Sequence, residues 1–285
     1  MSIHIHLGAH KTASTHLQAV LRRNRGGLAE AGIAYLGPDA IRALSARGAR
    51  AAAKMGVWPS LRALAARRRL GRALQGGRII ASDENALGGC AEMMRAGRLY
   101  PHARARLRVW SGVKPGARLY LCIREYGPFL SGAYVQSLVG GRAGRAVDAA
   151  RLAALPRRWP DVVADIAAAL PGRRLTVWDY ADYAALGPVV LGAMTGDVPL
   201  EPVSRRPMAT PSARAVEIVL DMVQGGRATR ADLEAAAHDH PIGPDQPKFS
   251  LFDAETSARL ALQFREDLDA IAARADVDLL RLEGV

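Results

Sequence analysis

Cysteine is scarce in this sequence. Only Cys90 and Cys122 occur among its 285 residues, and both stand among apolar residues. Two thiols are too few for a framework of disulfide bonds, so we expect both to be reduced. The sequence also begins without the basic segment, apolar run and small-residue cleavage site of a secretory signal. These features predict a cytoplasmic protein.

Long apolar runs and aromatic residues are also rare. No uninterrupted apolar stretch approaches the ~18 residues that a membrane-spanning helix needs, and we therefore expect no membrane span. Aromatic residues make up only 5% of the chain and do not alternate with basic residues, as a stacking surface for single-stranded nucleic acid requires. The net charge of +12 is compatible with a polyanionic substrate or a phosphate-rich cofactor, and we expect no nucleic-acid partner.

What the sequence does contain is abundant apolar material, 49% of the chain, in which short strands alternate with helical patterns. Predicted strands cover residues 3–7, 33–36, 78–82, 119–123 and 175–178. Predicted helices cover residues 14–25, two segments of 40–75 separated near 56–59, and segments starting near 128, after 186, at 215 and at 254. This alternation predicts a three-layer α/β/α fold around a central, mostly parallel sheet. We expect one domain over residues 1–285.

The turn between the first predicted strand and the first predicted helix carries residues suited to an anion. Such a turn aims unpaired backbone N–H groups and the positive end of the helix at one place. Lys11 adds a full charge, and the hydroxyls of Thr12, Ser14 and Thr15 add donors. Gly8 precedes Lys11 by three residues, so the loop is shorter than the Gly-x4-Gly-Lys-Ser/Thr loop of nucleotide triphosphatases. The alternative is a capped helix with a surface lysine.

The segment "HKTASTHLQ", residues 10–18, resembles the sulfotransferase family, in particular bacterial members with an HKTGTT-x-LQ loop. The resemblance implies a P-loop-like fold that binds 3′-phosphoadenosine 5′-phosphosulfate (PAPS) without a metal. In that family this loop holds the 5′-phosphosulfate, which assigns cofactor binding to Gly8, Lys11, Thr12, Ala13, Ser14 and Thr15. Ala13 stands where glycine is usual, which matters if the position has a positive φ.

A second match lies at the end of the strand predicted over 119–123. Family members carry an arginine there and a serine about eight residues later, and both hold the 3′-phosphate. Here Arg124 is followed by Ser131 after seven residues and by Gly132 after eight. The planar guanidinium suits a phosphate because it donates two parallel hydrogen bonds. Weaker matches imply that Tyr180 lies near the adenine and Lys248 near the 3′-phosphate.

The catalytic residues are implied by strand order. In the family the general base follows the strand that precedes the arginine-bearing one, and here that strand ends in Asp83 and Glu84. We therefore expect Glu84 to accept the acceptor's proton, with Asp83 and then His10 as alternatives. Lys11 is expected to neutralise charge on the leaving phosphate. Without the resemblance, the two acids indicate only the start of a helix.

The resemblance thus implies transfer of a sulfuryl group from PAPS to a hydroxyl or amine of a small-molecule or glycan acceptor. The alternatives are a P-loop-type nucleotide kinase, which depends on ATP and magnesium, and a non-catalytic relative that binds a nucleotide or polyanion. The basic run at 67–69 is a solvated helix face or a docking patch for an anionic acceptor. His4 and His6 share one face of a strand but lack partner ligands, and we expect no metal site.

Overall fold

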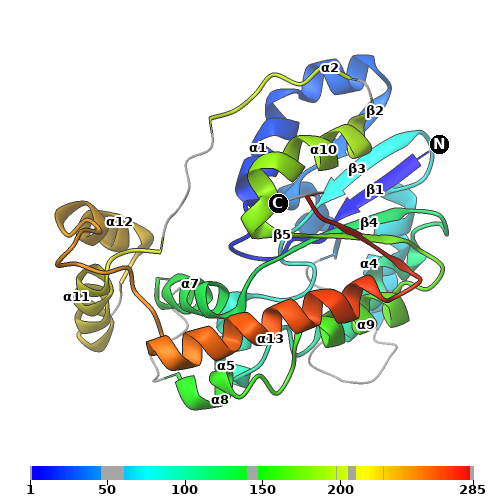
Figure 1. Cartoon of the computed structure of the whole chain (residues 1–285). Coiled ribbons are helices and arrows are strands. Elements are labelled where there is room, and N and C mark those ends of the chain that lie inside the picture. The colour runs from blue at the N-terminus through cyan, green and yellow to red at the C-terminus, as the bar shows by residue number, and fades with distance from the viewer. Residues whose placement is uncertain are drawn as a thin grey trace.

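The computed structural model describes residues 2–45, 61–139, 147–196, 198–204, 210–226 and 228–282. A six-stranded sheet lies at its centre in the order β2-β3-β1-β4-β5-β6, and each neighbouring pair of strands is parallel. Helices cover both faces of this sheet (Figure 1). The predicted three-layer α/β/α fold is confirmed.

The strands agree closely with the sequence pattern. They are β1 (Ser2–His6), β2 (Ile33–Leu36), β3 (Arg78–Ser82), β4 (Arg118–Ile123), β5 (Leu175–Asp179) and β6 (Val277–Leu280). The first five confirm the predicted strands, whereas β6 was not predicted. It is a four-residue strand at the edge of the sheet in which only Val277 is buried. Its Asp278 pairs with Arg174, so the segment lacks the apolar character that identifies a strand.

The helices agree less well. They are α1 (Ser14–Arg23), α2 (Arg25–Glu30), a helix over residues 38–45, α4 (Leu61–Ala73), α5 (Cys90–Ala96), α6 (Ala103–Leu107), α7 (Tyr126–Leu138), α8 (Ala149–Ala153), α9 (Trp159–Ala169), α10 (Tyr183–Thr195), α11 (Ala213–Gln224), α12 (Arg230–Asp239) and α13 (Ala254–Ala272). Short 3₁₀ helices, η1 (Arg108–Gly112) and η2 (Tyr180–Asp182), follow α6 and β5. The predicted helix 14–25 is divided at Asn24. The break predicted near 56–59 lies outside the described residues.

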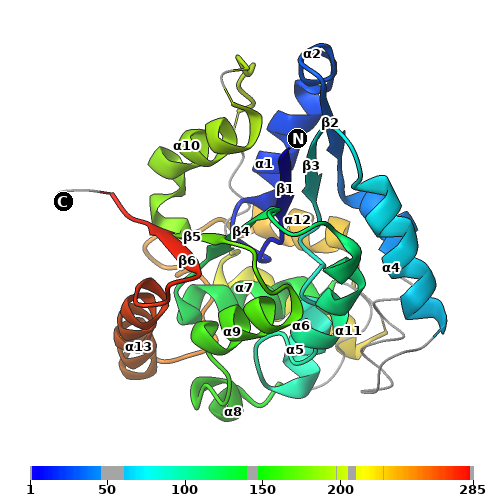
Figure 2. The same ribbon diagram turned by 90° about the vertical axis from the view of Figure 1, so that its right-hand side faces the viewer.

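Alternate side chains of the strands fill the two layers on either side of the sheet. Leu119, Leu121 and Ile123 of β4 belong to one buried cluster, which α4, α5, α7, α9 and α13 complete. Tyr120 and Cys122 of the same strand belong to the second cluster, which includes residues of α1 and α10. Figure 2 shows the helices on opposite sides of the sheet. Because β4 is apolar on both faces, it reads in sequence as an uninterrupted apolar run.

Strand β1 lies between β3 and β4. The chain leaves β1 toward β2 and β3 on one side and later builds β4 to β6 on the other. In open parallel sheets, ligands bind outside the carboxyl ends of the strands at such a switch point. The loops after β1, β3 and β4 all end there, which places the predicted site residues at one edge of the sheet.

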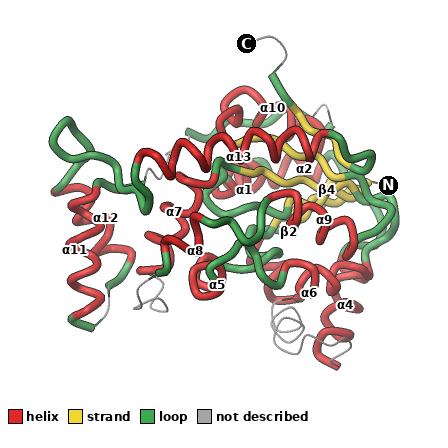
Figure 3. The backbone as a smooth tube through the Cα atoms, turned by 60° about the horizontal axis from the view of Figure 1, so that its bottom comes forward, coloured by secondary structure: helices red, strands yellow, loops and turns green. Residues whose placement is uncertain are grey.

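Helices α11 and α12 stand beside α7, at one side of the molecule in Figures 1 and 3. Val216 and Val219 of α11 nevertheless belong to the same buried cluster as the sheet. A bridge between Ser212 and Lys248 joins the two ends of the segment that carries both helices. None of the helices that the structure describes is long and apolar enough to cross a membrane.

Candidate anion-binding and catalytic site

The loop between β1 and α1 has an unusual backbone. Lys11 and Ala13 both adopt positive φ, at 59° and 60°, and Gly8 has φ 99°. The hydroxyls of Thr12 and Ser14 each donate a 2.8 Å hydrogen bond to the carbonyl oxygen of Ala9, which holds the loop in a tight curl. Ala13, at the position of the expected glycine, therefore adopts the left-handed conformation that favours glycine.

The curl leaves backbone donors unpaired. The helix begins with hydrogen bonds from the N–H groups of His16 and Leu17 to the carbonyl of Ala13. Within the part of the chain that the structure describes, the N–H groups of residues 11–15 have no acceptor. A run of free N–H groups at a helix N-terminus is an anion site, and alternating left- and right-handed residues strengthen it. The exposed Thr15 adds a hydroxyl at the same helix end.

Lys11 contributes a positive charge to this loop. Its methylene chain packs on Gly132 of α7, where an added Cβ would lie 3.3 Å from Cγ of the lysine. Burial lowers the pKa of Lys11, and the positive charges of Arg124 and Arg230 lower it further. Lys11 forms no ion pair with any described carboxylate. Its charge is thus available to an anion.

Arg124 follows β4 and is held on two sides. Its Nη1 donates a 2.9 Å hydrogen bond to the carbonyl oxygen of Lys11, and its guanidinium lies 4.4 Å from the centre of the Tyr180 ring. Burial lowers its pKa, although a guanidinium stays charged in proteins. Tyr180, expected near an adenine, instead has one ring face covered by Arg124. Its contact with a nucleotide base stays a prediction.

Lys248 approaches the same place from the loop after α12. Burial lowers its pKa, and Arg124 lowers it further. Lys11, Arg124 and Lys248, here called the cation cluster, are thus brought together from three separate loops, as the resemblance implies. Arg230 at the start of α12 also acts on Lys11 and was not expected from the sequence. It is exposed and pairs with Glu234.

Ser131 is buried, and its hydroxyl makes two hydrogen bonds within the protein. It donates to the carbonyl of Gly127 at 2.8 Å and accepts from the N–H of Leu251 at 3.1 Å. These bonds join α7 to the segment before α13. Gly132, the residue at the expected spacing, carries the lysine chain instead. Contact between Ser131 and a 3′-phosphate stays a prediction.

Glu84, just after β3, is the best placed of the three candidate bases. Its carboxylate accepts hydrogen bonds from Gln18 at 2.8 Å, from Arg42 at 2.5 Å and from the Asn85 amide at 3.2 Å. Burial acts to raise the pKa of Glu84, but the Gln18 hydrogen bond and the Arg42 charge hold it below its usual value of 4.5. About a quarter of the side chain, 24%, is exposed. It is therefore an ionised, oriented acceptor with an open side.

Asp83 and His10 are less accessible. Asp83 is buried, accepts hydrogen bonds from Arg42 and from the N–H of Asn85, and has a pKa that burial raises. His10 is also buried, with Nδ1 against the Tyr100 hydroxyl at 3.1 Å and Nε2 donating to Asn85 at 3.2 Å. Burial lowers the pKa of His10. A neutral ring with both nitrogens engaged supports the loop rather than accepting a proton.

The loops after β1 and β3 touch directly. A Cβ added to Gly8 would lie 2.9 Å from Cα of Glu84, so only glycine allows this approach. Gln18 and Arg42, which orient Glu84, were missed in the sequence. Arg42 lies in the helix that follows β2, and β2 neighbours β3. The pairing of β2 with β3 thus brings Arg42 to the Glu84 carboxylate.

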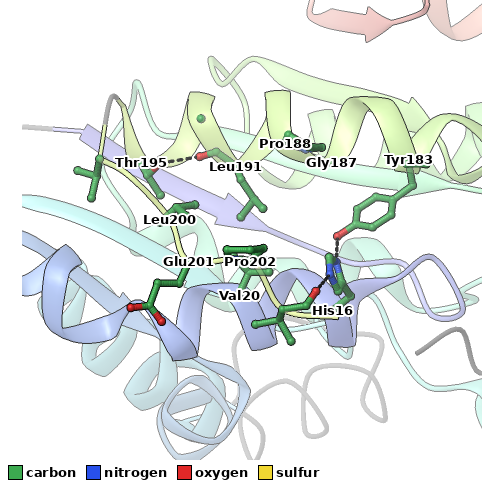
Figure 4. A pocket seen from close by; sticks show the side chains of 14 residues that line it. His16, Val20, Tyr183, Gly187, Pro188, Leu191, Thr195, Leu200, Glu201 and Pro202 are labelled. Carbon is green, nitrogen blue, oxygen red and sulfur yellow. Dashed lines mark hydrogen bonds between the residues drawn. The ribbon is translucent and has the colours of Figure 1, made fainter. Parts of the chain in front are cut away.

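An apolar cavity of about 530 Å³ lies between α1, α10 and residues 198–203. His16 closes one end: its Nδ1 accepts from the Tyr183 hydroxyl at 2.8 Å, and its Nε2 donates to the Val203 carbonyl at 2.9 Å (Figure 4). His16 is one residue beyond the free N–H groups. The cavity therefore starts beside the anion site and extends along α10.

The histidines of β1 have structural partners. His4 is bonded to the Tyr120 hydroxyl and His6 to the Ser82 hydroxyl, and burial lowers the pKa of each to about 4. Among the described residues, no group of three or more His, Cys, Asp or Glu side chains is arranged to hold a metal ion. Comparisons with protein-family models, with curated proteins and with solved structures yield no match to this chain.

Proposed function

We propose that the protein is a PAPS-dependent sulfotransferase that acts in the cytoplasm on a small-molecule or glycan acceptor. The observation that carries the proposal is the pairing of five free backbone N–H groups at residues 11–15 with a cation cluster that forms no ion pair with a described carboxylate, although the charge of Glu125 acts on Arg124 and Lys248. Such an arrangement suits a ligand with negative charge at two separate places. A bisphosphorylated adenosine has this property.

The residues present fit the cosubstrate. Its 5′-phosphosulfate would be held by the N–H groups of residues 11–15, by the Lys11 ammonium and by the Thr15 hydroxyl. Arg124 and Lys248 would hold the 3′-phosphate, because a charged fork and a second cation offer several charge-assisted hydrogen bonds. The start of the apolar cavity, beside His16, is a site for the base.

The bound cosubstrate would supply the sulfuryl group, and the chain would supply charge stabilisation and a proton acceptor. Lys11 and the helix N-terminus would stabilise charge that develops on the departing phosphate. Glu84 would accept the proton of the acceptor hydroxyl or amine. Arg42 and Gln18 would keep the carboxylate of Glu84 ionised and correctly oriented throughout.

One observation favours the alternative of a magnesium-dependent nucleotide kinase. Asp83 and Glu84 follow β3, a neighbour of β1, and a carboxylate at that position is suited to a hydrated magnesium ion. In this chain, however, Arg42 engages both carboxylates. A kinase would have to displace Arg42 before either acid bound the ion.

Calorimetric titration separates these functions. The purified protein is titrated in EDTA with 3′-phosphoadenosine 5′-phosphate, and separately with ATP in EDTA and in magnesium. The proposal predicts metal-independent binding of the 3′-phosphorylated nucleotide that is tighter than binding of ATP. Tighter binding of magnesium–ATP would contradict it and favour the kinase. Tight binding without sulfuryl transfer to any hydroxyl-bearing acceptor would indicate the non-catalytic relative.

A further inference from the structure

The exposed face of α4 carries charge of one sign. Arg62, Arg68, Arg69 and Arg72 are exposed and lie within about a third of the helix circumference, given 3.6 residues per turn. We call them the α4 arginine face. None of the four forms an ion pair with a carboxylate among the described residues. Nothing within the described fold therefore neutralises this face.

The sequence around α4 maintains this charge. Residues 40–82 contain ten lysines and arginines and no aspartate or glutamate. Residues 93–124, which include α6, η1 and β4, contain eight basic residues and again no acid. The backbones of α4 and η1 are in close contact, since a Cβ added to Gly71 would lie 2.8 Å from the carbonyl oxygen of Gly112.

This face is connected to the catalytic carboxylate. Arg69 donates from Nε to the carbonyl of Leu44 at 3.4 Å, so α4 lies against the helix over residues 38–45. Arg42 of that helix binds Glu84. Asp39 of the same helix lies 4.0 Å from Arg42, and its side chain is fully exposed. A chain bound along α4 would therefore run toward Glu84.

We infer that the α4 arginine face binds an acidic polysaccharide, and that this polysaccharide is the sulfuryl acceptor. The second part of this inference, that the polysaccharide is the sulfuryl acceptor, rests on the proposed function. The arginines span about 15 Å along the helix, which suits an extended polyanion better than a compact ion. Each guanidinium matches the geometry of a sugar carboxylate. The polysaccharide also offers the hydroxyl that sulfuryl transfer requires, whereas a DNA duplex offers none within its strands.

The described residues give the α4 arginine face positive charge but no aromatic ring on which a nucleic-acid base could stack. The aromatic residues of the neighbouring segment 93–124, Tyr100, Trp110 and Tyr120, are all buried. Proteins that hold single-stranded nucleic acid combine basic grooves with exposed aromatic rings. The charge and the absence of described aromatic rings on this face favour the glycan over a single-stranded nucleic acid.

The test measures binding of a fluorescent polygalacturonate oligosaccharide at low salt by anisotropy. A triple variant, R62Q/R68Q/R72Q, removes three charges from the face. The matched control, R22Q/R25Q/R265Q, removes three charges from exposed arginines of α1, α2 and α13. We expect the face variant to lose binding about tenfold or more, because each exposed charge contact contributes modestly. The control should stay within about twofold of the wild type.

Three results would overturn the inference. They are no binding of polygalacturonate by the wild type, equal losses in the face and control variants, and tighter binding of a duplex DNA of the same charge. A neutral dextran of the same length should not bind. Titration of the wild type and both variants with 3′-phosphoadenosine 5′-phosphate keeps the two proposals separate.

If the wild type does not bind this nucleotide, the sulfotransferase proposal is refuted, whereas the result on polysaccharide binding still stands.

The acceptor role has its own readout. With polygalacturonate as acceptor, the face variant should show KM for the polysaccharide raised about tenfold or more, with kcat within about twofold of the wild type. An unchanged KM would contradict the acceptor assignment even if the face binds polyanions.

Discussion

Arg124 donates a hydrogen bond to the carbonyl oxygen of Lys11 at 2.9 Å, so the loops after β4 and β1 are joined by the two residues expected to bind opposite ends of one nucleotide. The bond fixes the guanidinium beside the loop whose N–H groups are free. It also lets Arg124 hold the loop in shape as well as bind an anion. The effects of replacing Arg124 must therefore be measured both on the stability of the protein and on the binding of the nucleotide.

Replacing Ala13 with glycine should stabilise the protein by about 1 kcal/mol. Alanine at φ 60° pays a steric cost that glycine avoids, and this gain exceeds the extra entropy of glycine in the unfolded chain. Urea unfolding measures the change.

The same substitution at Ala19 is the control for Ala13→Gly. Ala19 lies inside α1, where glycine costs about 1 kcal/mol. Opposite signs at the two positions are expected. Destabilisation at both would show that residue 13 is not left-handed in solution.

Replacing Gly8 with alanine should destabilise the protein by about 3 kcal/mol. The new Cβ would meet the backbone of Glu84 at 2.9 Å, at a residue with φ 99°, so both a clash and backbone strain arise. Gly32→Ala isolates the strain, because Gly32 has φ 72° and open space around it. Its expected cost is about 1 kcal/mol. Equal costs, measured by thermal unfolding, would mean that the two loops do not touch.

Glu84→Gln should lower turnover by roughly 100-fold and leave affinity for the 3′-phosphorylated nucleotide nearly unchanged. In the proposed mechanism the carboxylate would accept the acceptor's proton, while the cation cluster would hold the nucleotide. Asp83→Asn is the neighbouring control and should reduce the rate much less, because Asp83 is buried. An unaffected rate in Glu84→Gln would assign the proton to another group.

Arg42→Gln should shift the acid limb of the pH–rate profile upward. Arg42 helps to hold the pKa of Glu84 below 4.5, and a base must be ionised to act. In the wild type the rate therefore falls only at low pH, and in the variant it falls at a higher pH. If the acid limb of the pH–rate profile stays at the same pH in Arg42→Gln, either Glu84 is not the base or Arg42 does not control its pKa.

His6 should make stability depend on pH. Burial lowers its folded pKa from 6.5 to about 4, so the unfolded chain binds the proton more readily. The stability that the folded state owes to a neutral His6 is complete above pH 6.5, and it is lost as pH falls toward 4 because the unfolded chain takes up the proton. Between pH 7 and pH 5 the loss is about 2 kcal/mol. Urea unfolding of His6→Asn, which has no such titration, should show a pH dependence smaller by that amount, and an identical dependence would contradict the assignment.

The central strands were predictable because apolar runs with a clear length mark buried parallel strands. Edge strand β6 was not, since Asp278 breaks its apolar pattern. Helix α7 was predicted from about residue 128 but begins at Tyr126. It is buried on nearly every side, so no helical period marks its first turn. Helices α5, α6 and α8 have only five to seven residues, too few for a period to show.

The proximity of the loops after β1, β3 and β4 was predictable because parallel strands end at one edge. Lys11, Arg124 and Lys248 lie near one another, and their role as a binding site stays a prediction. The hydrogen-bond partners of the nearby hydroxyl groups were not predictable. Thr12 and Ser14 donate to the Ala9 carbonyl and so curl the loop, and Ser131 accepts from Leu251 and so joins α7 to the segment before α13. Such roles depend on tertiary contacts. Arg42 shows the same limit, because a long-range ion pair leaves no periodic trace in sequence.

The most direct measurement compares two nucleotides in three proteins. Wild type, Lys11→Ala and Arg124→Ala are titrated in EDTA with 3′-phosphoadenosine 5′-phosphate and with adenosine 5′-phosphate. The account predicts that the wild type prefers the first nucleotide by about 10- to 100-fold, as expected for charge-assisted hydrogen bonds to one phosphate. That preference should disappear in Arg124→Ala and persist in Lys11→Ala, which weakens both nucleotides alike. Equal affinity of the wild type for the two nucleotides, or a preference that survives in Arg124→Ala, would contradict it.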